Sequence, residues 1–104
     1  MQILVSANNK VDVSTDMEHR VRASVEAELK HFDDRLTRIE VHLSDENSLK
    51  GGPQDKRCQM EARIKAHEPI SVSHKAGSFG LAIDGAITKL SSALAHTLGK
   101  LNRR

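Results

Sequence analysis

The sequence predicts an α+β fold: a two-layer sandwich of a four-stranded mixed sheet with two helices on one face. Three segments alternate apolar and polar residues, and this period of two indicates strands with one buried and one solvated face. Two longer segments repeat apolar residues every three or four positions, which indicates helices with one buried side. The order along the chain is β-α-β-β-β-α, and 104 residues leave room for a single domain, residues 1–104, around one core.

The first strand and the first helix follow each other across a turn signal. Residues 2–8, QILVSAN, are rich in β-forming residues and stop at the turn-forming NNK. A helix is predicted over 14–32, with Thr15 and Glu18 in the positions of a capping box. Its apolar side, at spacings of four, four, four and three, comprises Met17, Val21, Val25, Leu29 and Phe32.

Three strands are predicted next, over 36–44, 58–66 and 68–76. Their alternation separates an inward, apolar set from an outward, polar set. Because both helices need a core, they should cover the same face of the sheet, and the first strand should pair in parallel through a right-handed crossover. The inward residues are Ile39, Val41 and Leu43, then Cys58, Met60, Ala62 and Ile64, then Ile70 and Val72.

The last element is a long helix over 78–101, with Ser78 as its predicted N-cap. Its one acidic residue, Asp84, stands near the N-terminus, where the helix dipole favours a negative charge. The buried side of this helix should consist of Ile83, Ile87, Leu90, Leu94, Leu98 and Leu101.

Composition and charge narrow the classes of function. The chain has 16 Lys and Arg against 14 Asp and Glu, a formal charge of +2, so a nucleic-acid partner requires the positive charge to be gathered on one face. Two Phe are the only aromatic residues, which argues against a site that stacks bases or sugars on rings. A single cysteine, no export signal and no apolar segment of membrane-spanning length predict a cytoplasmic protein.

Signals of catalysis are weak. Cys58 falls on the apolar side of its strand, which favours a packed thiol over a nucleophile. Asp45, Glu46 and Asp55 stand among basic residues, with no apolar wall to raise a carboxyl pKa. The six histidines form no dense cluster and are interpreted as solvated surface residues. We therefore expect no enzymatic activity, no metal site, no cofactor and no small-molecule substrate.

One feature of the last helix points to a phosphate-rich partner. At 100° per residue, four basic side chains project within about 60° of one another, away from the leucine side. Gly85 and Ser92 share this band, and no acidic residue does. An exposed helix usually mixes charges of both signs, so an ordinary solvated face and a surface for a phosphate backbone both stay open. This basic stripe consists of Lys89, His96, Lys100 and Arg103.

The same helix carries a family resemblance. Its segment AIDGAITKLSSALAHTLGK contains an A-I-D triplet at 82–84, the pair Lys89-Leu90, then Leu94 and a spaced lysine, Lys100. Together with the order of elements, this segment resembles the ribosome hibernation promoting factor family, which includes the cold-shock ribosome-associated translation inhibitor. The chain is similar to a short, divergent branch of that family over essentially its whole length.

The resemblance implies a non-enzymatic stress-response protein that binds the small ribosomal subunit and its rRNA, with no membrane partner. Such a protein occupies the channel of mRNA and tRNAs and inhibits translation in dormancy. A homo-oligomer is compatible with the resemblance but is not implied by it. Carried over to this sequence, the expected rRNA-binding residues are Lys89, Lys100, Arg103, His96, Arg20, Arg22, Lys56, Arg57 and Arg63.

The polar connector between the second and third strands, DENSLKGGPQDKR at 45–57, is longer than a hairpin turn requires. It resembles a variable connector of the family. We interpret it as a secondary rRNA-contact loop, with a solvated hairpin as an equally open alternative. The residues expected to make that end of the sheet basic are Lys50, Lys56, Arg57, Arg63 and Lys65.

Two other classes of function fit the sequence. The order of elements is similar to that of double-stranded-RNA-binding domains, although their usual form lacks the first strand and only Lys75 stands near the start of the last helix. A protein-interaction adaptor without ribosome binding would instead use the polar face of the sheet or an exposed edge strand.

Overall fold

The computed structural model describes residues 1–8, 11–46 and 55–102, with side chains described up to residue 99. It confirms the α+β sandwich and the order of its predicted strands and helices. Within the described residues, a short 3-10 helix, η1, is the one element that the sequence did not predict. The elements are β1 (Gln2–Ala7), α1 (Thr15–Leu29), η1 (Lys30–Arg35), β2 (Leu36–Asp45), β3 (Lys56–Ile64), β4 (Ile70–Ala76) and α2 (Phe79–Asn102).

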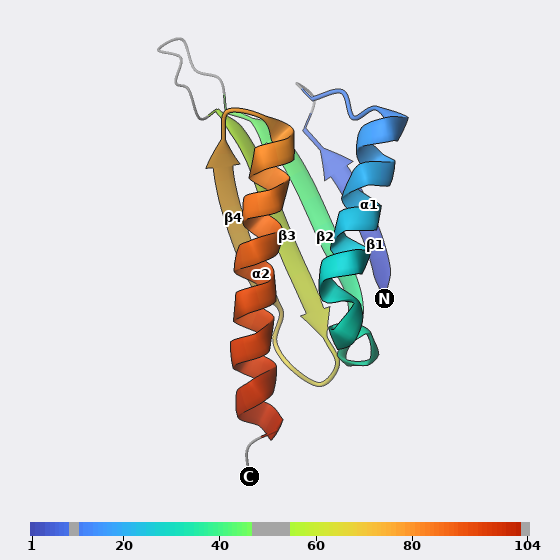
Figure 1. The fold of residues 1–104 in the computed structure, drawn as a ribbon, viewed down its shortest axis with the longest axis vertical. Coiled ribbons are helices and arrows are strands. Elements are labelled where there is room, and N and C mark those ends of the chain that lie inside the picture. The colour runs from blue at the N-terminus through green and yellow to red at the C-terminus, as the bar shows by residue number, and fades with distance from the viewer. Residues whose placement is uncertain (9–10, 47–54, 103–104) are drawn as a thin grey trace.

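The sheet has the order β1-β2-β3-β4, so its two outer strands are the first and the last along the chain. β1 pairs in parallel with β2, with Ile3 opposite Ile39, and the other two pairs are antiparallel. Both helices lie on the same face of the sheet, α1 beside β1 and β2 and α2 along β3 and β4 (Figure 1). The predicted parallel crossover and the single covered face are therefore confirmed.

The core is aliphatic and fills the space between the helices and the covered face of the sheet. The predicted inward side chains of β2 and β3 are buried, while Ile70 and Val72 of the outer strand β4 are half-buried. α2 buries every described member of its predicted apolar side, and Ala82 and Ala86 as well. Full burial of one large aliphatic side chain contributes about 1.5–3 kcal/mol, so this layer is the main source of stability.

The two ends of α1 differ from the prediction. Ser14, not Thr15, is the N-cap, and its hydroxyl accepts a hydrogen bond from the backbone N–H of Met17 at 3.1 Å. The predicted capping box is wrong because Ser14 has the extended backbone of a cap, whereas Thr15 is already helical. At the other end α1 stops at Leu29, and η1 continues the chain with Phe32 still buried.

The start of α2 agrees with the prediction. The hydroxyl of Ser78 accepts a hydrogen bond from the backbone N–H of Leu81 at 3.2 Å, which satisfies one of the free donors of the first turn. The last predicted member of the apolar side, Leu101, lies outside the described side chains.

One histidine lies between the sheet and α2 rather than on the surface. His74 of β4 is half-buried because the alternation of the strand places it on the covered face, with Cys58 as its partner in β3. Its ring lies so close to Gly85 that a Cβ atom there would come within 2.1 Å of the ring carbon Cδ2. The interpretation of all histidines as solvated is therefore wrong for His74, and Gly85 faces β4.

Each helix is tied to the outer strand beside it by a basic side chain. Arg22 of α1 donates a hydrogen bond to the carbonyl of Ile3 in β1. Lys89 of α2 donates one to the carbonyl of Ser73 in β4, with an N–O distance of 2.9 Å. Charged side chains at sheet edges discourage the addition of a further strand, so these two positions disfavour an adaptor that works by strand addition.

Candidate nucleic-acid interface

The described part of the basic stripe lies on the flank of α2 beside β4. Lys89 and His96 are both exposed there. The hydrogen bond to the Ser73 carbonyl holds the Lys89 ammonium in place and leaves two of its three N–H donors available for a phosphate. The side chain of Lys100 and all of Arg103 lie outside the described residues.

A second group of cations lies on the polar face of the sheet, where the connector joins it. Arg57 and Lys75 are directly opposite each other in the β3–β4 pair. Like charges in that position destabilise a strand pair, and Glu46 offsets this repulsion. Its carboxylate lies 2.6 Å from the Lys75 ammonium and 3.6 Å from the Arg57 guanidinium. The hydrogen bond from Lys75 holds the pKa of Glu46 below its ordinary value.

Lys56 forms a separate ion-pair group at the same end of the sheet, next to α2. Its ammonium lies 2.8 Å from Asp45 and 3.4 Å from Asp55, and 5.7 Å from the centre of the Phe79 ring. The hydrogen bond to Asp45 raises the pKa of Lys56. Lys50 lies outside the described residues. Every described cation at this end therefore has an acidic partner, so the expectation that the described end is basic on balance is wrong.

Two of the cations assigned to that end lie at the other end of β3. Arg63 is 3.2 Å from Glu61 and 3.5 Å from Glu40, all on the polar face of the sheet. Lys65 follows the strand, and its backbone N–H bonds to the carbonyl of Arg35. The length of β3, 9 residues, separates both from the connector. Their assignment to the connector end is therefore wrong.

The two predicted contact residues of α1 have different surroundings. Arg22 pairs with Glu18 at 3.0 Å on the side of β1. Arg20 is exposed, and its guanidinium lies against Gly80 in the first turn of α2, 3.1 Å from where a Cβ atom of that residue would stand. The described members of the predicted set thus lie on several surfaces. Lys89 and His96 share one side of α2, whereas Lys56 and Arg57 share the connector end but point to opposite faces of the sheet.

Lys75 and Glu46 were not predicted as interface residues. The alternation of β4 does predict that Lys75 points outward. The pairing of Lys75 with Arg57, however, depends on the register of β3 against β4, and the position of Glu46 depends on how the connector closes. Its closing hydrogen bond joins the backbone N–H of Glu46 to the carbonyl of Asp55 at 2.7 Å.

A serine–histidine pair lies on the polar face and was also not predicted. The hydroxyl of Ser6 in β1 and Nδ1 of His42 in β2 are 3.0 Å apart. The parallel register places these two residues directly opposite each other. Ser6 is exposed, so the pair meets bulk water, and we assign it the role of a cross-strand polar contact.

Cys58 is packed in the core, as predicted. Burial raises the pKa of its thiol to about 12, and the nearby Arg57 lowers it only in part. Since the thiolate is the reactive form, we expect a thiol reagent at pH 8 to label Cys58 no faster than the protein unfolds. The labelling rate should rise in parallel with the unfolded fraction as urea is added. Rapid labelling of the folded chain would contradict this burial.

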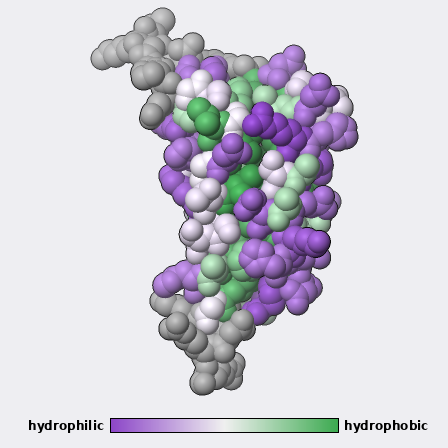
Figure 2. Space-filling view, viewed as in Figure 1, coloured by the Kyte–Doolittle hydropathy of each residue, from purple (hydrophilic) through white to green (hydrophobic). Residues whose placement is uncertain are grey.

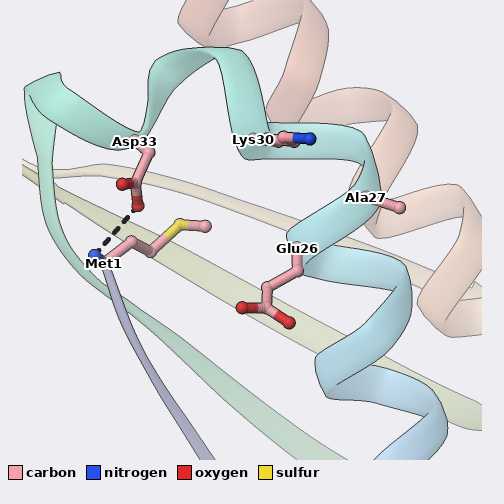
Figure 3. A pocket seen from close by; sticks show the side chains of 5 residues that line it. All are labelled: Met1, Glu26, Ala27, Lys30 and Asp33. Atoms are coloured by element: carbon pink, nitrogen blue, oxygen red, sulfur yellow. Dashed lines mark ion pairs between the residues drawn. The ribbon is translucent and has the colours of Figure 1, made fainter.

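A further hollow lies between α1, η1 and the start of β1, away from the predicted rRNA-binding residues. It has a volume of about 530 Å³ and is lined by the residues of Figure 3. The amine of Met1 pairs with the Asp33 carboxylate at 2.9 Å, while Glu26 and Lys30 extend from the neighbouring helical turns. Its lining mixes both signs of charge and therefore selects no class of charged ligand.

Metal-ligand clusters and membrane-spanning helices are both absent from the described residues. No three side chains of His, Cys, Asp or Glu come together there as metal ligands would. None of the helices in this part of the chain combines the length and the apolar character needed to cross a membrane.

A comparison with known protein families identifies the family of this chain. The family described as "Sigma 54 modulation protein / S30EA ribosomal protein" matches residues 4–102. The chain belongs to this family. The resemblance to ribosome hibernation factors seen in the sequence is thereby confirmed. Comparison with curated protein sequences gave no match.

Two solved structures share the fold of this chain. The N-terminal domain of Protein Y from Thermus thermophilus is 18% identical, with a TM-score of 0.75 over 93% of this chain and 99% of that one. A ribosomal subunit interface protein from Coxiella burnetii is 17% identical, with a TM-score of 0.71 over 95% of this chain and 99% of that one. At these identities the likeness shows the shared fold.

The segment that carries the family resemblance serves two purposes in α2. Ala82, Ile83, Leu90 and Leu94 are buried against the sheet, so this part of the pattern is explained by packing. Lys89 is exposed and packing does not require it, so it is the described position of the segment best placed to contact a partner.

Proposed function

We propose that this member of the family binds the small ribosomal subunit through its rRNA, occupies the channel of mRNA and tRNAs, and inhibits translation in dormant cells. It acts in the cytoplasm and by binding alone, without catalysis or a cofactor. The contacts are made by the basic stripe of α2, with Lys89 and His96 in its described part. The connector end of the sheet contributes through Lys56 and Arg57. Arg20, Arg22 and Arg63 add weaker contacts because they lie on other surfaces.

The observation that carries this proposal is the charge of the flank of α2 beside β4. Its described cation, Lys89, has no acidic partner among the described residues. Its hydrogen bond goes to a backbone carbonyl, which is neutral, so the positive charge of Lys89 is not offset. The sheet cations Lys56, Arg57 and Arg63 are each paired with carboxylates. A phosphate backbone therefore meets unpaired charge on α2 and paired charge at the connector end, where binding must first replace an ion pair.

Co-sedimentation with isolated small and large ribosomal subunits, over a series of salt concentrations, tests the proposal. We expect the protein to pellet with the small subunit and to be released steeply as salt rises, because phosphate contacts release counterions. A short duplex RNA is the control ligand, and it should bind much more weakly than the subunit. Equal binding to the duplex would favour a double-stranded-RNA module. Protein left in the supernatant at low salt would contradict ribosome binding.

Removal of the Glu46 charge should strengthen binding to the small subunit rather than weaken it. Glu46→Gln frees Arg57 and Lys75 from their shared carboxylate, so affinity for the small subunit should rise several-fold and the salt dependence should become steeper. The melting temperature should fall slightly, because two like charges then face each other across the strand pair.

Asp12→Asn is the matched control for this change. It removes the same charge from an exposed residue with no ion-pair partner among the described residues. If both variants gain affinity equally, overall charge explains the effect, and the connector end is not part of the interface.

A further inference from the structure

A furrow runs along the helical face of the molecule, with α2 on one side and α1 followed by η1 on the other. Three hollows follow one another along it, with volumes of about 260, 320 and 440 Å³. Each is lined by residues from both sides, and each lining includes apolar side chains. Figure 2 shows a hydrophobic strip between the helices with hydrophilic side chains along its borders. The apolar side chains of the three hollows are Met17 and Ile83, then Ala27 and Ile87, then Phe32 and Leu98.

The middle hollow is negatively charged. Glu28 of α1 and Asp84 of α2 stand on its two sides, together with the hydroxyl groups of Ser24 and Thr88. Both carboxylates are exposed, and neither has an ion-pair partner among the described residues. No cation lines this hollow, so its two negative charges stand beside the apolar side chains of Ala27 and Ile87.

The end hollows are balanced in charge. Asp16 and Arg20 line one of them, and Asp34 and Arg35 line the other. The furrow as a whole therefore carries four acidic side chains, two arginines and one histidine, His31, and its negative charge is concentrated at the centre.

α2 thus presents opposite charges on its two flanks. Asp84 projects about 140° away from Lys89 around the helix axis. The contacts agree, because Asp84 lines the furrow toward α1 while Lys89 reaches the outer edge of β4. A phosphate backbone is attracted to the second flank and repelled by the first.

We propose that the furrow between α1 and α2 docks a basic segment of another protein, with lysine or arginine side chains at Glu28 and Asp84. Small apolar side chains of that segment lie on Ala27 and Ile87. An unpaired carboxylate on each helix fits cations on both sides of such a segment, and the row of hollows fits a peptide better than a compact ligand. The inference goes beyond the proposed function, because that function concerns RNA and the opposite flank of α2.

Fluorescence anisotropy with two synthetic peptides tests this inference. In the first, fluorescein-labelled peptide, lysine alternates with alanine and leucine; in the second, glutamate replaces lysine. We expect the purified full chain to bind the lysine peptide and not the glutamate peptide. Glu28→Lys with Asp84→Lys should weaken binding at least tenfold, while Asp12→Lys with Glu68→Lys, an equal change of charge at exposed positions outside the furrow, should leave it within twofold.

Several outcomes would overturn the inference. Equal losses of peptide affinity in the two double variants would mean that overall charge alone attracts the peptide. Absence of binding to the lysine peptide would exclude a basic segment as the occupant of the furrow. A chain that dimerises in solution, and loses the dimer in the Glu28/Asp84 variant, would assign the furrow to a second copy. In a further outcome, that variant binds the small subunit's naked rRNA more strongly and the wild type binds no peptide. This would mean that the acidic residues of the furrow only repel RNA.

The assay contains no RNA, so its failure leaves the rRNA proposal intact. Conversely, loss of peptide binding on Glu28/Asp84 reversal with unchanged binding of naked rRNA would separate the two surfaces. The melting temperature of each variant is the check on folding, since all four substituted residues are exposed and have no ion-pair partner in the described part of the chain.

Discussion

Reversal of two charges in the basic stripe, Lys89→Glu with Lys100→Glu, should lower affinity for the small ribosomal subunit on the order of a hundredfold at low salt. Each lost phosphate contact reduces the slope of log affinity against log salt by about 0.7 to 0.9, so the double variant should lose about 1.4 to 1.8. The new carboxylates also repel the backbone. Adding Arg103→Glu should remove most of the remaining affinity.

Lys30→Glu with Lys65→Glu is the matched control for the stripe. Both lysines are exposed, and both lie away from the flank of α2 that faces β4. This pair makes the same change in net charge and should cost little affinity. Thermal unfolding of all variants should stay close to the wild type. If the control loses as much affinity as the stripe variant, the interface has been assigned to the wrong surface.

Gly85→Ala should destabilise the fold by about 1–3 kcal/mol, although alanine is the better helix former. The added Cβ would stand 2.1 Å from Cδ2 and 2.5 Å from Cγ of His74. Because Cγ is the ring atom nearest the backbone, a small shift of the outer ring atoms alone does not relieve this overlap. Either the ring must change rotamer or α2 must move away from β4.

The sign of this effect should reverse when His74 is replaced. A His74→Ala background removes the three atoms nearest the new methyl group, and there Gly85→Ala should stabilise the chain by up to ~1 kcal/mol through helix propensity. Chemical denaturation of the four members of this cycle measures the coupling directly. Gly99→Ala is a second control, since a Cβ there meets nothing within 4 Å. Equal effects of Gly85→Ala in both backgrounds would contradict the close contact.

The elements were predictable because their signals are local. A period of two placed the inward residues of β2 and β3, and a period of three to four placed the buried side of α2. The same period of two also places His74 on the covered face with Val72. Its polar ring led to a surface assignment, whereas the outer position of β4 lets the ring be half-buried against a glycine.

The N-cap of α1 was ambiguous for a different reason. Ser14 and Thr15 are adjacent and both can cap, so only the backbone angles of Ser14 distinguish them.

The charged contacts were not predictable because they depend on distances between elements. Arg57 meets Lys75 through the register of two strands, and Glu46 reaches both only where β2 ends. The furrow depends on the separation of α1 from α2, which no pattern in either helix specifies. Single residue positions therefore identified candidate cations, but the structure was needed to show which of them are already paired.

Competition on the small ribosomal subunit tests whether the protein occupies the channel of mRNA and tRNAs. Small subunits carrying a labelled mRNA and a labelled tRNA would be titrated with the wild-type protein, and release of both labels measured. Occupation of the channel predicts that both are displaced, and that the Lys89/Lys100 double variant displaces them only at far higher concentration. Simultaneous binding of the protein, mRNA and tRNA to the same subunit would contradict it.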